Sequence, residues 1–421
     1  MVAKRIVATP DAKAAKKAHR KETIGVALYH HGSESIPGLG ANLRDQVIRG
    51  LPSPPSDQAW DFLSITLAVF AADRFVLRSE GEDGWTRVLA VDVAVNDTKR
   101  WKPLAEQLAK AMRYLTGDIW TFTFSPDGDT APKFQGELSD RDTVCLFSGG
   151  LDSFLGALKL LNDGKAPLLV SQGSPKEIRP QQYLAGRLGL EDHRFDGRVH
   201  EIWRQPYEGS TRSRSLLFIA YGVLAATSLN KHEVIIPENG LIAINPPMTL
   251  RRLGSLSTRT THPYFLSQME TILEAAGLKI RLNNIFEGKS KGDMLKAAKH
   301  PSLEALASAT YSCGKGKRKN GQCGNCVPCL IRRASFEAAG VDDKTKYVGD
   351  KIKWARTHDD VASVRIALAR RKVLSKPAFE RWVLKSGPLP VDRKRRTTIM
   401  TGVAKGLDEV EAFLAGVQWK N

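Results

Sequence analysis

Long apolar runs are absent from this chain of 421 residues: nowhere do about 18 consecutive apolar residues occur, the length that a membrane-spanning helix needs. We therefore expect no contact with a membrane. Residues 1–22 are basic but lack the continuous apolar core of a secretory signal, so they predict a solvated basic tail on a cytoplasmic protein. Internal repeats are also absent, and the length suggests two or three folded units.

Acidic residues are in short supply, with 45 Asp and Glu against 63 Lys and Arg, which gives a formal net charge of +18. Most of the excess lies in residues 1–22, 313–333 and 365–400, and the rest of the chain is close to neutral. These segments could meet nucleic acid, an acidic partner or only water. If this protein binds nucleic acid, segment 365–400 is the candidate.

Cysteine is scarce, yet four of the five cysteines form the pattern C-x9-C-x2-C-x2-C, at Cys313, Cys323, Cys326 and Cys329. A C-x2-C turn brings two thiolates to one ion, and four thiolates at about 2.3 Å hold Zn²⁺. A disulfide framework does not suit a chain without a secretory signal. An iron–sulfur cluster is the remaining rival, but the longer first spacing and the helix that follows favour structural zinc. The fifth cysteine, Cys145, is expected to be a buried apolar residue.

A phosphate-binding loop is predicted where apolar residues 144–147 lead into Ser148-Gly149-Gly150-Leu151-Asp152-Ser153 and helix-forming residues 154–161 follow. A strand that turns into a helix through small residues directs several backbone N–H groups into one concavity, where the helix dipole adds positive potential. The two serine hydroxyls can donate to phosphate oxygens. Asp152 beside an anion would hold the loop's own N–H groups or a Mg²⁺ ion. An ordinary strand–turn–helix junction uses the same residue types, so the prediction rests on the complete six-residue string and not on any single residue of it.

Strands and helices alternate over residues 142–312, which predicts βαβ units and a parallel sheet. The apolar strand 233–237 ends at Glu238-Asn239-Gly240, at the carboxyl edge where doubly wound sheets bind ligands. A carboxylate next to an amide suits a guanine-like edge, although a simple E-N-G turn has the same sequence.

The predicted domain division is a basic tail over 1–22, an added N-terminal α+β domain over 23–140, a central domain over 141–340 and a helical C-terminal region over 341–421. The N-terminal domain carries no catalytic motif, and we expect it to bind substrate, a partner or a second subunit. Its expected strands are 24–30, 74–78, 88–95 and 120–124, and its expected helices are 57–72 and 102–116.

Three motifs, in this order along the chain, resemble one family. The string S-G-G-x-D-S at 148–153 matches the phosphate loop of the N-type ATP pyrophosphatases, which cleave ATP to AMP and pyrophosphate while activating an acid as its adenylate. Arg214-Ser215-Leu216-Leu217-Phe218 resembles the R-N-x-x-F segment of QueC, the 7-cyano-7-deazaguanine synthase family. Residues 323–340, which begin Cys323-Gly324-Asn325-Cys326, look like the zinc-site helix of that family. The resemblance implies a doubly wound parallel sheet of the adenine nucleotide alpha hydrolase type, Rossmann-like.

The resemblance further implies an enzyme that adenylates 7-carboxy-7-deazaguanine with ATP and lets ammonia displace AMP. The expected cofactors are ATP, Mg²⁺ and structural Zn²⁺. Three of the implied catalytic residues also have a plainer reading, His262 as a cap before a proline and Lys291 and Arg214 as solvated cations at helix starts. The implied site residues are Asp152, Arg214, Lys291 and His262 for catalysis; Leu146, Phe147, Ser148, Gly149, Gly150, Asp152, Ser153 and Gln172 for ATP; Glu238, Asn239, Gly240 and Arg252 for substrate; and Cys313, Cys323, Cys326 and Cys329 for the metal.

The chain departs from the family in its substrate loop, where a Gly-Tyr-Pro-Asp-Cys-Arg type of pattern is absent and residues 245–252 stand instead. With the N-terminal addition, this makes the chain more similar to the larger QueC-like proteins, such as QatC, of bacterial anti-phage defence systems. That likeness implies a deazaguanine-like small molecule and a protein partner from the same defence operon, whose amino group could replace ammonia. Two alternatives stay open, a tRNA-modifying pyrophosphatase and a non-catalytic ATP-gated assembly module.

Overall fold

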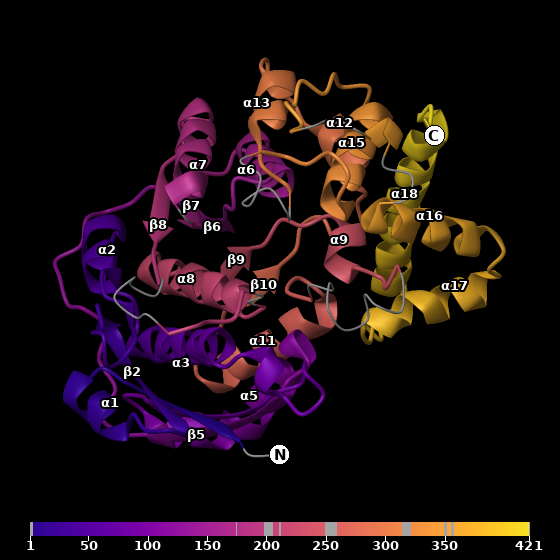
Figure 1. Cartoon of the computed structure of the whole chain (residues 1–421). Helices are drawn as coiled ribbons and strands as arrows, with labels where there is room; N and C mark the ends of the chain where they lie inside the picture. Colours follow the sequence, from indigo (N-terminus) through magenta and orange to yellow (C-terminus); the bar gives the residue numbers. More distant parts are fainter. Residues whose placement is uncertain are drawn as a thin grey trace.

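Two five-stranded parallel sheets form the frame of the molecule, and helices cover both faces of each (Figure 1). The computed structural model describes residues 3–173, 175–197, 205–209, 212–248, 259–313, 321–348, 352–354 and 358–420. The first sheet comes from the N-terminal part of the chain, at the bottom of Figure 1, and the C-terminal helices lie at the right. The fold is therefore α/β, as the sequence predicts.

The first sheet is parallel in every neighbouring pair and has the strand order β3-β2-β1-β4-β5. Its elements are Lys4–Thr9 (β1), Ala12–Ala18 (α1), Thr23–His30 (β2), Gly38–Gly40 (β3), Leu43–Gly50 (α2), Asp57–Phe75 (α3), Val88–Ala94 (β4), Thr98–Trp101 (α4), Ala105–Thr116 (α5) and Ile119–Ser125 (β5). Because alternate residues of a strand face opposite sides, Val26 and Leu28 join the main core, whereas Ala27 packs with Ala15. Helix α1 thus covers one face of the sheet, and α3 and α5 cover the other.

The N-terminal segment corrects the sequence-based prediction. Residues 4–9, assigned to a solvated tail, form β1, the central strand of the first sheet. The sequence-based prediction missed this strand because its first residues are charged. In the structure these charges are paired, Lys4 with Glu22 at 3.1 Å and Arg5 with Asp92 at 3.0 Å. Since the sheet is parallel throughout, this region is α/β and not α+β.

The strand predicted at residues 74–78 is also wrong, because α3 continues to Phe75 and a 3-10 helix, Arg78–Glu80, follows. The other elements predicted for the N-terminal domain are confirmed in kind. The helix expected from residue 102 begins with a 3-10 turn, Lys102–Leu104, before α5.

The second sheet is parallel as well, with the strand order β10-β9-β6-β7-β8. Its elements are Thr143–Leu146 (β6), Leu151–Asn162 (α6), Pro167–Gln172 (β7), Pro175–Arg187 (α7), Asp192–Phe195 (β8), Arg214–Ser228 (α8), Glu233–Ile235 (β9), Gly240–Ile244 (α9), Pro263–Ala275 (α11), Arg281–Asn283 (β10), Lys291–Ala297 (α12) and Leu303–Ala309 (α13). Helices α6 and α7 share a cluster with Cys145 and Leu169, and α8 and α11 share one with Val144 and Leu168. The strand order reverses between β6 and β9, and ligands bind outside the carboxyl ends of the strands at such a switch point.

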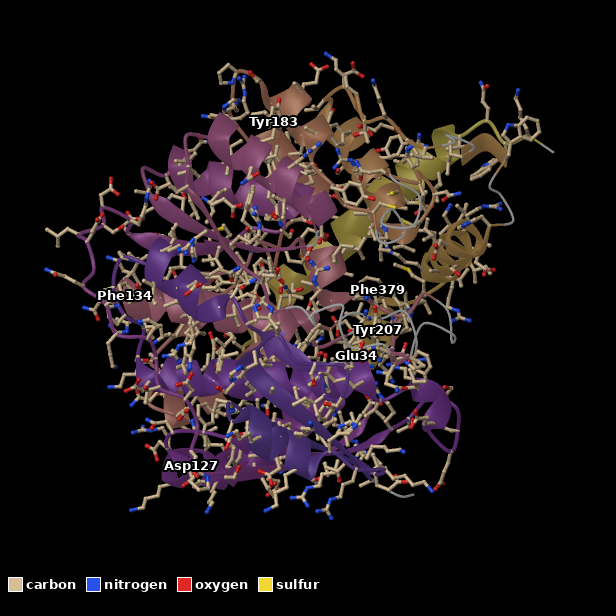
Figure 2. The ribbon with its side chains drawn as sticks, turned by 60° about the vertical axis from the view of Figure 1, so that its left-hand side comes forward. Glu34, Asp127, Phe134, Tyr183, Tyr207 and Phe379 are labelled. Atoms are coloured by element: carbon tan, nitrogen blue, oxygen red, sulfur yellow. The ribbon has the colours of Figure 1, made fainter. Side chains whose placement is uncertain are left out.

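One hydrophobic core joins the two sheets. Helix α3 packs on the first sheet and against α8, which packs on the second, and α5 meets α11 in the same layer. Trp60 of α3 and Tyr221 of α8 are both fully buried in this core. The domain boundary predicted at residue 140 therefore separates the two sheets along the chain, but one hydrophobic core contains residues from both sides of it. Tyr183 on α7 and Asp127 after β5 mark opposite ends of the stack of layers in Figure 2.

The two sheets have the same connectivity: counted from its own first strand, each has the order 3-2-1-4-5. At the switch point of the first sheet lies Asp61 of α3, which is 1% exposed. Its carboxylate accepts hydrogen bonds from the backbone N–H groups of Asn96 and Asp97, at 2.7 and 3.0 Å, and from the indole of Trp101 at 3.2 Å.

A buried ion network connects the first sheet to the start of α8. Arg87 Nη2 lies 2.6 Å from Asp73 Oδ1 and 2.7 Å from Asp118 Oδ2, and Arg78 pairs with Asp118 at 3.1 Å. Burial acts to raise the pKa of Asp118, but Arg87 and Arg78 hold this pKa below its usual value. Asp73 Oδ2 also accepts from the N–H and hydroxyl of Ser213, at 2.9 and 2.8 Å. One carboxylate thus stabilises the buried network and the N-terminus of α8.

The C-terminal region is helical, as predicted. Its helices are Val327–Ala339 (α15), Asp359–Lys372 (α16), Lys376–Val383 (α17) and Arg393–Gly416 (α18), with 3-10 turns at Ile352–Trp354 and Leu384–Ser386. Helix α18 packs against α9, α12 and α15, so this region rests beside the carboxyl edge of the second sheet. Within the part of the chain that the structure describes, no helix is both long and apolar enough to cross a membrane.

Replacing Asp73 with Ala should lower the free energy of unfolding by about 3–5 kcal/mol, because Arg87 stays buried with one partner fewer and α8 loses its cap. Urea unfolding followed by circular dichroism measures this loss. Glu106→Ala is the control, since it breaks an exposed pair with Lys110 (2.7 Å) and should leave the free energy of unfolding nearly unchanged. Similar losses in the two variants would contradict a stabilising role for the network.

Candidate functional site

A cavity of about 440 Å³ opens at the switch point of the second sheet, where the loops after β6 and β9 meet. Both halves of the molecule contribute to it, because its wall contains Leu115 of α5, a helix that covers the first sheet, as well as the predicted phosphate loop. The wall carries charges of both signs, from Asp152, Glu177, Glu238, Arg212, Arg214, Arg259 and Lys291. Such a mixture suits a ligand with anionic and hydrogen-bonding groups.

The loop from Ser148 to Ser153 forms the predicted turn. Gly149 has a φ of +76°, and Gly150 is the N-cap of α6. The hydroxyls of Ser148 and Ser153 lie 3.2 Å apart, and Ser153 Oγ donates to the carbonyl of Gly150 at 3.0 Å. Since the loop residues other than Gly149 line the cavity, the first N–H groups of α6 and the positive end of its dipole are directed to it. This arrangement is able to hold phosphate or pyrophosphate.

Two glutamines support the loop from β7 and α7. Gln181 Nε2 donates to the carbonyls of Ser148 and Gln172, at 3.3 and 3.0 Å. Gln172 Nε2 in turn donates to the carbonyl of Arg214 at 3.0 Å. Gln172 lines the cavity, and its contact with ATP stays a prediction, whereas Gln181 is a positioning residue that no sequence signal indicated.

The end of β6 lies in the core and not in the cavity. Leu146 and Phe147, both predicted to contact ATP, belong to the apolar clusters on the two faces of the sheet and are absent from the cavity wall. They fix the strand from which the loop departs. Cys145 is fully buried, and burial raises its pKa to about 12, in agreement with its predicted apolar role.

Asp152 and Lys291 meet in the cavity, where Lys291 Nζ lies 2.7 Å from Asp152 Oδ2. Burial, and next the charge of Asp152, raise the pKa of Glu238 well above its usual value. Two neighbouring carboxyl groups therefore share one ammonium group. Carboxylate oxygens are the ligands that Mg²⁺ prefers, and a divalent cation between Asp152 and Glu238 would keep both groups ionised.

Asn239 and Gly240 do not have the substrate-reading role that the sequence suggested. Asn239 is fully buried: its Oδ1 accepts a backbone N–H at 3.1 Å as the N-cap of α9, and its Nδ2 donates to Asp152 and Glu238 at 3.3 Å. A Cβ at position 240 would lie 2.5 Å from the carbonyl oxygen of Glu287, so glycine is required there for packing. Of the E-N-G string, Glu238 is the residue that lines the cavity.

Arg214 begins α8, as predicted, and it lines the cavity. Its Nη2 lies 3.2 and 3.1 Å from the two carboxylate oxygens of Glu177 on α7. This pairing offsets the unfavourable position of a cation at a helix N-terminus. Sequence reasoning missed Glu177 because no pattern relates α7 to the start of α8. An anionic ligand would compete with Glu177 for the guanidinium.

His262 lies outside the cavity wall, which corrects its predicted catalytic role. It is fully buried as the N-cap of α11, where Nδ1 accepts from the N–H of Tyr264 at 3.2 Å and the ring packs edge-on against Tyr114. Burial and the charge of Arg259 lower its pKa to about 3, so the imidazole is neutral at physiological pH. Arg252, the remaining predicted substrate residue, lies outside the described residues.

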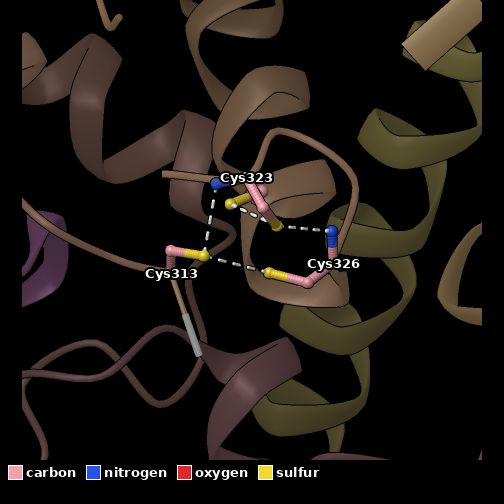
Figure 3. A group of neighbouring side chains, drawn as sticks. Cys313, Cys323 and Cys326 are labelled. Carbon is pink, nitrogen blue, oxygen red and sulfur yellow. Dashed lines mark hydrogen bonds between the residues drawn. The ribbon is translucent and has the colours of Figure 1, made fainter. Parts of the chain in front are cut away.

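The four clustered cysteines converge on one point (Figure 3). All four Sγ atoms lie within 4.8 Å of one another, with 3.7 Å between Cys313 and Cys326 and 3.9 Å between Cys323 and Cys329. A tetrahedral ion with Zn–S bonds of about 2.3 Å gives S···S distances of about 3.8 Å. Disulfides require about 2.05 Å, and a cluster of several irons would hold the sulfurs farther apart. The geometry therefore fits a single tetrahedral ion such as Zn²⁺.

The cysteine cluster is linked to the phosphate loop through the segment that precedes Cys313. The N–H of Tyr311 donates to the carbonyl of Gly149 at 2.9 Å, and the N–H of Leu151 donates to Ser312 Oγ at 3.4 Å. Cys313 itself lines the cavity. A metal ion held by the four thiolates would therefore also fix the position of the loop.

Gly149→Ala should weaken the binding of inorganic pyrophosphate about tenfold or more, because an L-residue at φ +76° costs about 1–2 kcal/mol and the new Cβ would lie 3.0 Å from Gln181 Cγ. Isothermal titration calorimetry measures the affinity. Gly164→Ala is a matched control, with a φ of +74° and nothing within 4 Å of the added Cβ. Unchanged affinity in the Gly149 variant, or an equal loss in both, would contradict the loop's role.

Purified protein should contain about one equivalent of zinc, and Cys329→Ser should remove it and lower the melting temperature, because structural zinc contributes on the order of 10 kcal/mol to folding. Elemental analysis and thermal unfolding provide the measurements. Cys145→Ala, which removes a buried thiol outside the cluster, should keep the metal. Iron with acid-labile sulfide in place of zinc would overturn the assignment.

Comparison with known proteins agrees with the motifs. The family model described as "Queuosine biosynthesis protein QueC" matches residues 260–340. The chain is 27% identical over 220 residues to 7-cyano-7-deazaguanine synthase 1 of Sulfurisphaera tokodaii, covering 49% of this chain and 97% of the relative. It is 24% identical over 240 residues to 7-cyano-7-deazaguanine synthase of Azotobacter vinelandii, covering 50% of this chain and all of that protein. A shorter match, 34% identical over 92 residues, covers 40% of the enzyme of Ralstonia pickettii. This chain is thus similar to whole 7-cyano-7-deazaguanine synthases over about half its length.

Proposed function

We propose that this protein is an ATP-dependent enzyme that activates a 7-deazaguanine carboxylate, or a closely similar acid, as its adenylate and transfers it to an amine. The observation that carries the proposal is a single cavity into which the phosphate loop, the Asp152–Lys291 pair and Glu238 all open. The similarity to 7-cyano-7-deazaguanine synthases supports it. Their names specify a 7-deazaguanine product, and we propose an acid with the same ring system.

The phosphate loop and Lys291 are placed to bind the two outer phosphates of ATP. The N–H groups at the start of α6 donate to phosphate oxygens, and the ammonium group of Lys291 adds a positive charge beside them. Asp152 and Glu238 would hold Mg²⁺, which neutralises charge on the phosphates. Arg214 would leave Glu177 for a phosphate or for the carboxylate of the substrate.

Activation takes place when a carboxylate oxygen of the acid bonds to the α-phosphorus and the bond from that phosphorus to the bridging oxygen breaks. Pyrophosphate then leaves with the electron pair and stays in the loop, whose N–H groups stabilise its charge. In the second step, the amine bonds to the acyl carbon, AMP leaves, and the amine loses a proton. The loop therefore acts on the leaving group of the first step, and Glu238, in the wall of the same cavity, is a candidate for ordering the acid.

The acceptor that we propose is ammonia or an amino group on a partner protein from the same defence operon. The changed substrate loop and the N-terminal sheet, which simple synthases of about 220–240 residues do not have room for, support the second choice. The likeness to anti-phage QueC-like proteins such as QatC remains part of this proposal.

A tRNA-modifying pyrophosphatase is the less favoured function. It depends on the basic segment 365–400, yet two of the arginines at the start of α18 already have partners within the protein. Arg395 binds Glu287 in bidentate fashion at 2.7 and 2.9 Å, and Arg396 donates to the carbonyls of Pro390 and Val391. These contacts reduce the charge left for a phosphate backbone.

With 7-carboxy-7-deazaguanine, ATP, Mg²⁺ and an ammonium salt, the purified protein should release AMP and pyrophosphate, measured by chromatography of nucleotides and a coupled pyrophosphate assay. Lys291→Met should lower kcat about 100-fold or more, because it removes a charge beside the leaving group. Lys405→Met is the control, since Lys405 pairs with Asp293 at the surface. Absence of AMP with every amine tried, including purified partner proteins, would overturn the proposal.

A further inference from the structure

The C-terminal end of α5, which belongs to the first sheet, forms part of the wall of the cavity. Leu115 lines the cavity, and the carbonyls on either side of it hold two arginines that also line it. Arg259 Nη1 donates to the carbonyl of Tyr114 at 3.0 Å, and Arg212 Nη1 donates to that of Thr116 at 2.8 Å. The added N-terminal region thus positions two cations in the cavity.

These contacts follow from the chemistry of a helix end. The last carbonyls of a helix have no partner within it and carry the negative end of its dipole, so they attract guanidinium groups. Aromatic rings of the same region hold the guanidinium planes: Arg259 lies over Tyr114 at 5.0 Å, and Arg212 lies over Trp85 at 5.3 Å. Both arginines therefore have a fixed orientation before any ligand binds.

The charge of Arg259 differs from those of the other cations in the cavity. Lys291 pairs with Asp152, and Arg214 pairs with Glu177. Among the residues that the structure describes, no carboxylate forms an ion pair with Arg259, and its Nε is buried without a hydrogen-bond partner. Burial, and next the positive charge of Arg259, lower the pKa of His262 to about 3. A half-buried guanidinium held by a backbone carbonyl is best neutralised by an anion from a ligand.

We propose that Arg259, assisted by Arg212, binds the carboxylate of the acid that this enzyme activates. The inference rests on the proposed function and names the subsite that selects the acid. The phosphates of ATP have their own cradle in the loop from Ser148 to Ser153, whereas this subsite lies on the wall that α5 supplies. A planar guanidinium matches a carboxylate in bidentate fashion. The N-terminal region, which carries no catalytic motif, therefore determines which acid is accepted.

The subsite can be tested by pyrophosphate exchange with 7-carboxy-7-deazaguanine as the acid. Arg259→Gln should raise the KM for the acid about tenfold to a hundredfold and leave the KM for ATP unchanged, because a charged hydrogen bond is lost on the acid alone. Arg259→Lys should show an intermediate KM, since it keeps the charge but loses the bidentate geometry. The matched control is Arg113→Gln, which removes an exposed arginine from the same helix end. Thermal unfolding of all variants separates a binding defect from a folding defect.

Titration calorimetry supplies a second readout that needs no turnover. The unmodified protein should bind 7-carboxy-7-deazaguanine more tightly than 7-deazaguanine, which lacks the carboxylate, and Arg259→Gln should abolish this preference. An active protein whose Arg259→Gln variant keeps its KM for the acid would overturn the subsite but not the proposed function. A carboxylate preference that depends on Arg259 without any exchange would overturn the function but not the subsite. A rise in the KM for ATP alone would assign Arg259 to phosphate and overturn the inference.

Discussion

The carboxylate of Asp73 is the group on which the arrangement of this molecule depends most. One oxygen binds Arg87 inside the first sheet, and the other caps α8 through Ser213. Helix α8 begins with Arg214 and packs on the second sheet, so a single buried acid sets both the junction of the two sheets and the start of a helix at the cavity. Burying charges is costly unless each has good partners, and here the partners come from both halves of the chain.

Two other segments, each distant in sequence from the phosphate loop, also fix the position of residues in the cavity wall. The cysteine cluster does this through Tyr311 and Ser312, and the end of α5 does it through two carbonyls that hold Arg212 and Arg259. The segment before Cys313 thus holds the loop that follows β6 through the backbone of Tyr311 and the hydroxyl of Ser312, whereas the end of α5 holds the two arginines of the opposite wall.

The sequence predicted those parts of the site that are contiguous along the chain, and it failed where tertiary contacts decide. The loop from 148 to 153 and the four cysteines carry their geometry in their spacing. Asn239 and His262 were misassigned because a polar residue before a helix can serve a ligand or a cap, and only the surroundings distinguish the two. Arg259 gave no signal, since its role arises from a helix end more than a hundred residues away.

The two sheets share one strand order but differ in what lies at the carboxyl ends of their strands. In the second sheet, the cavity lies outside the carboxyl ends of the first and fourth strands, and the proposed function fills it with small molecules. In the first sheet, the backbone N–H groups of Asn96 and Asp97, which follow the fourth strand, donate to the buried carboxylate of Asp61. The start of α1, which corresponds to the start of α6 in the second sheet, is likewise capped by the carboxylate of Asp11. The same strand order thus occurs once with a cavity at the carboxyl ends of its strands and once with the backbone N–H groups there bound by the protein's own carboxylates.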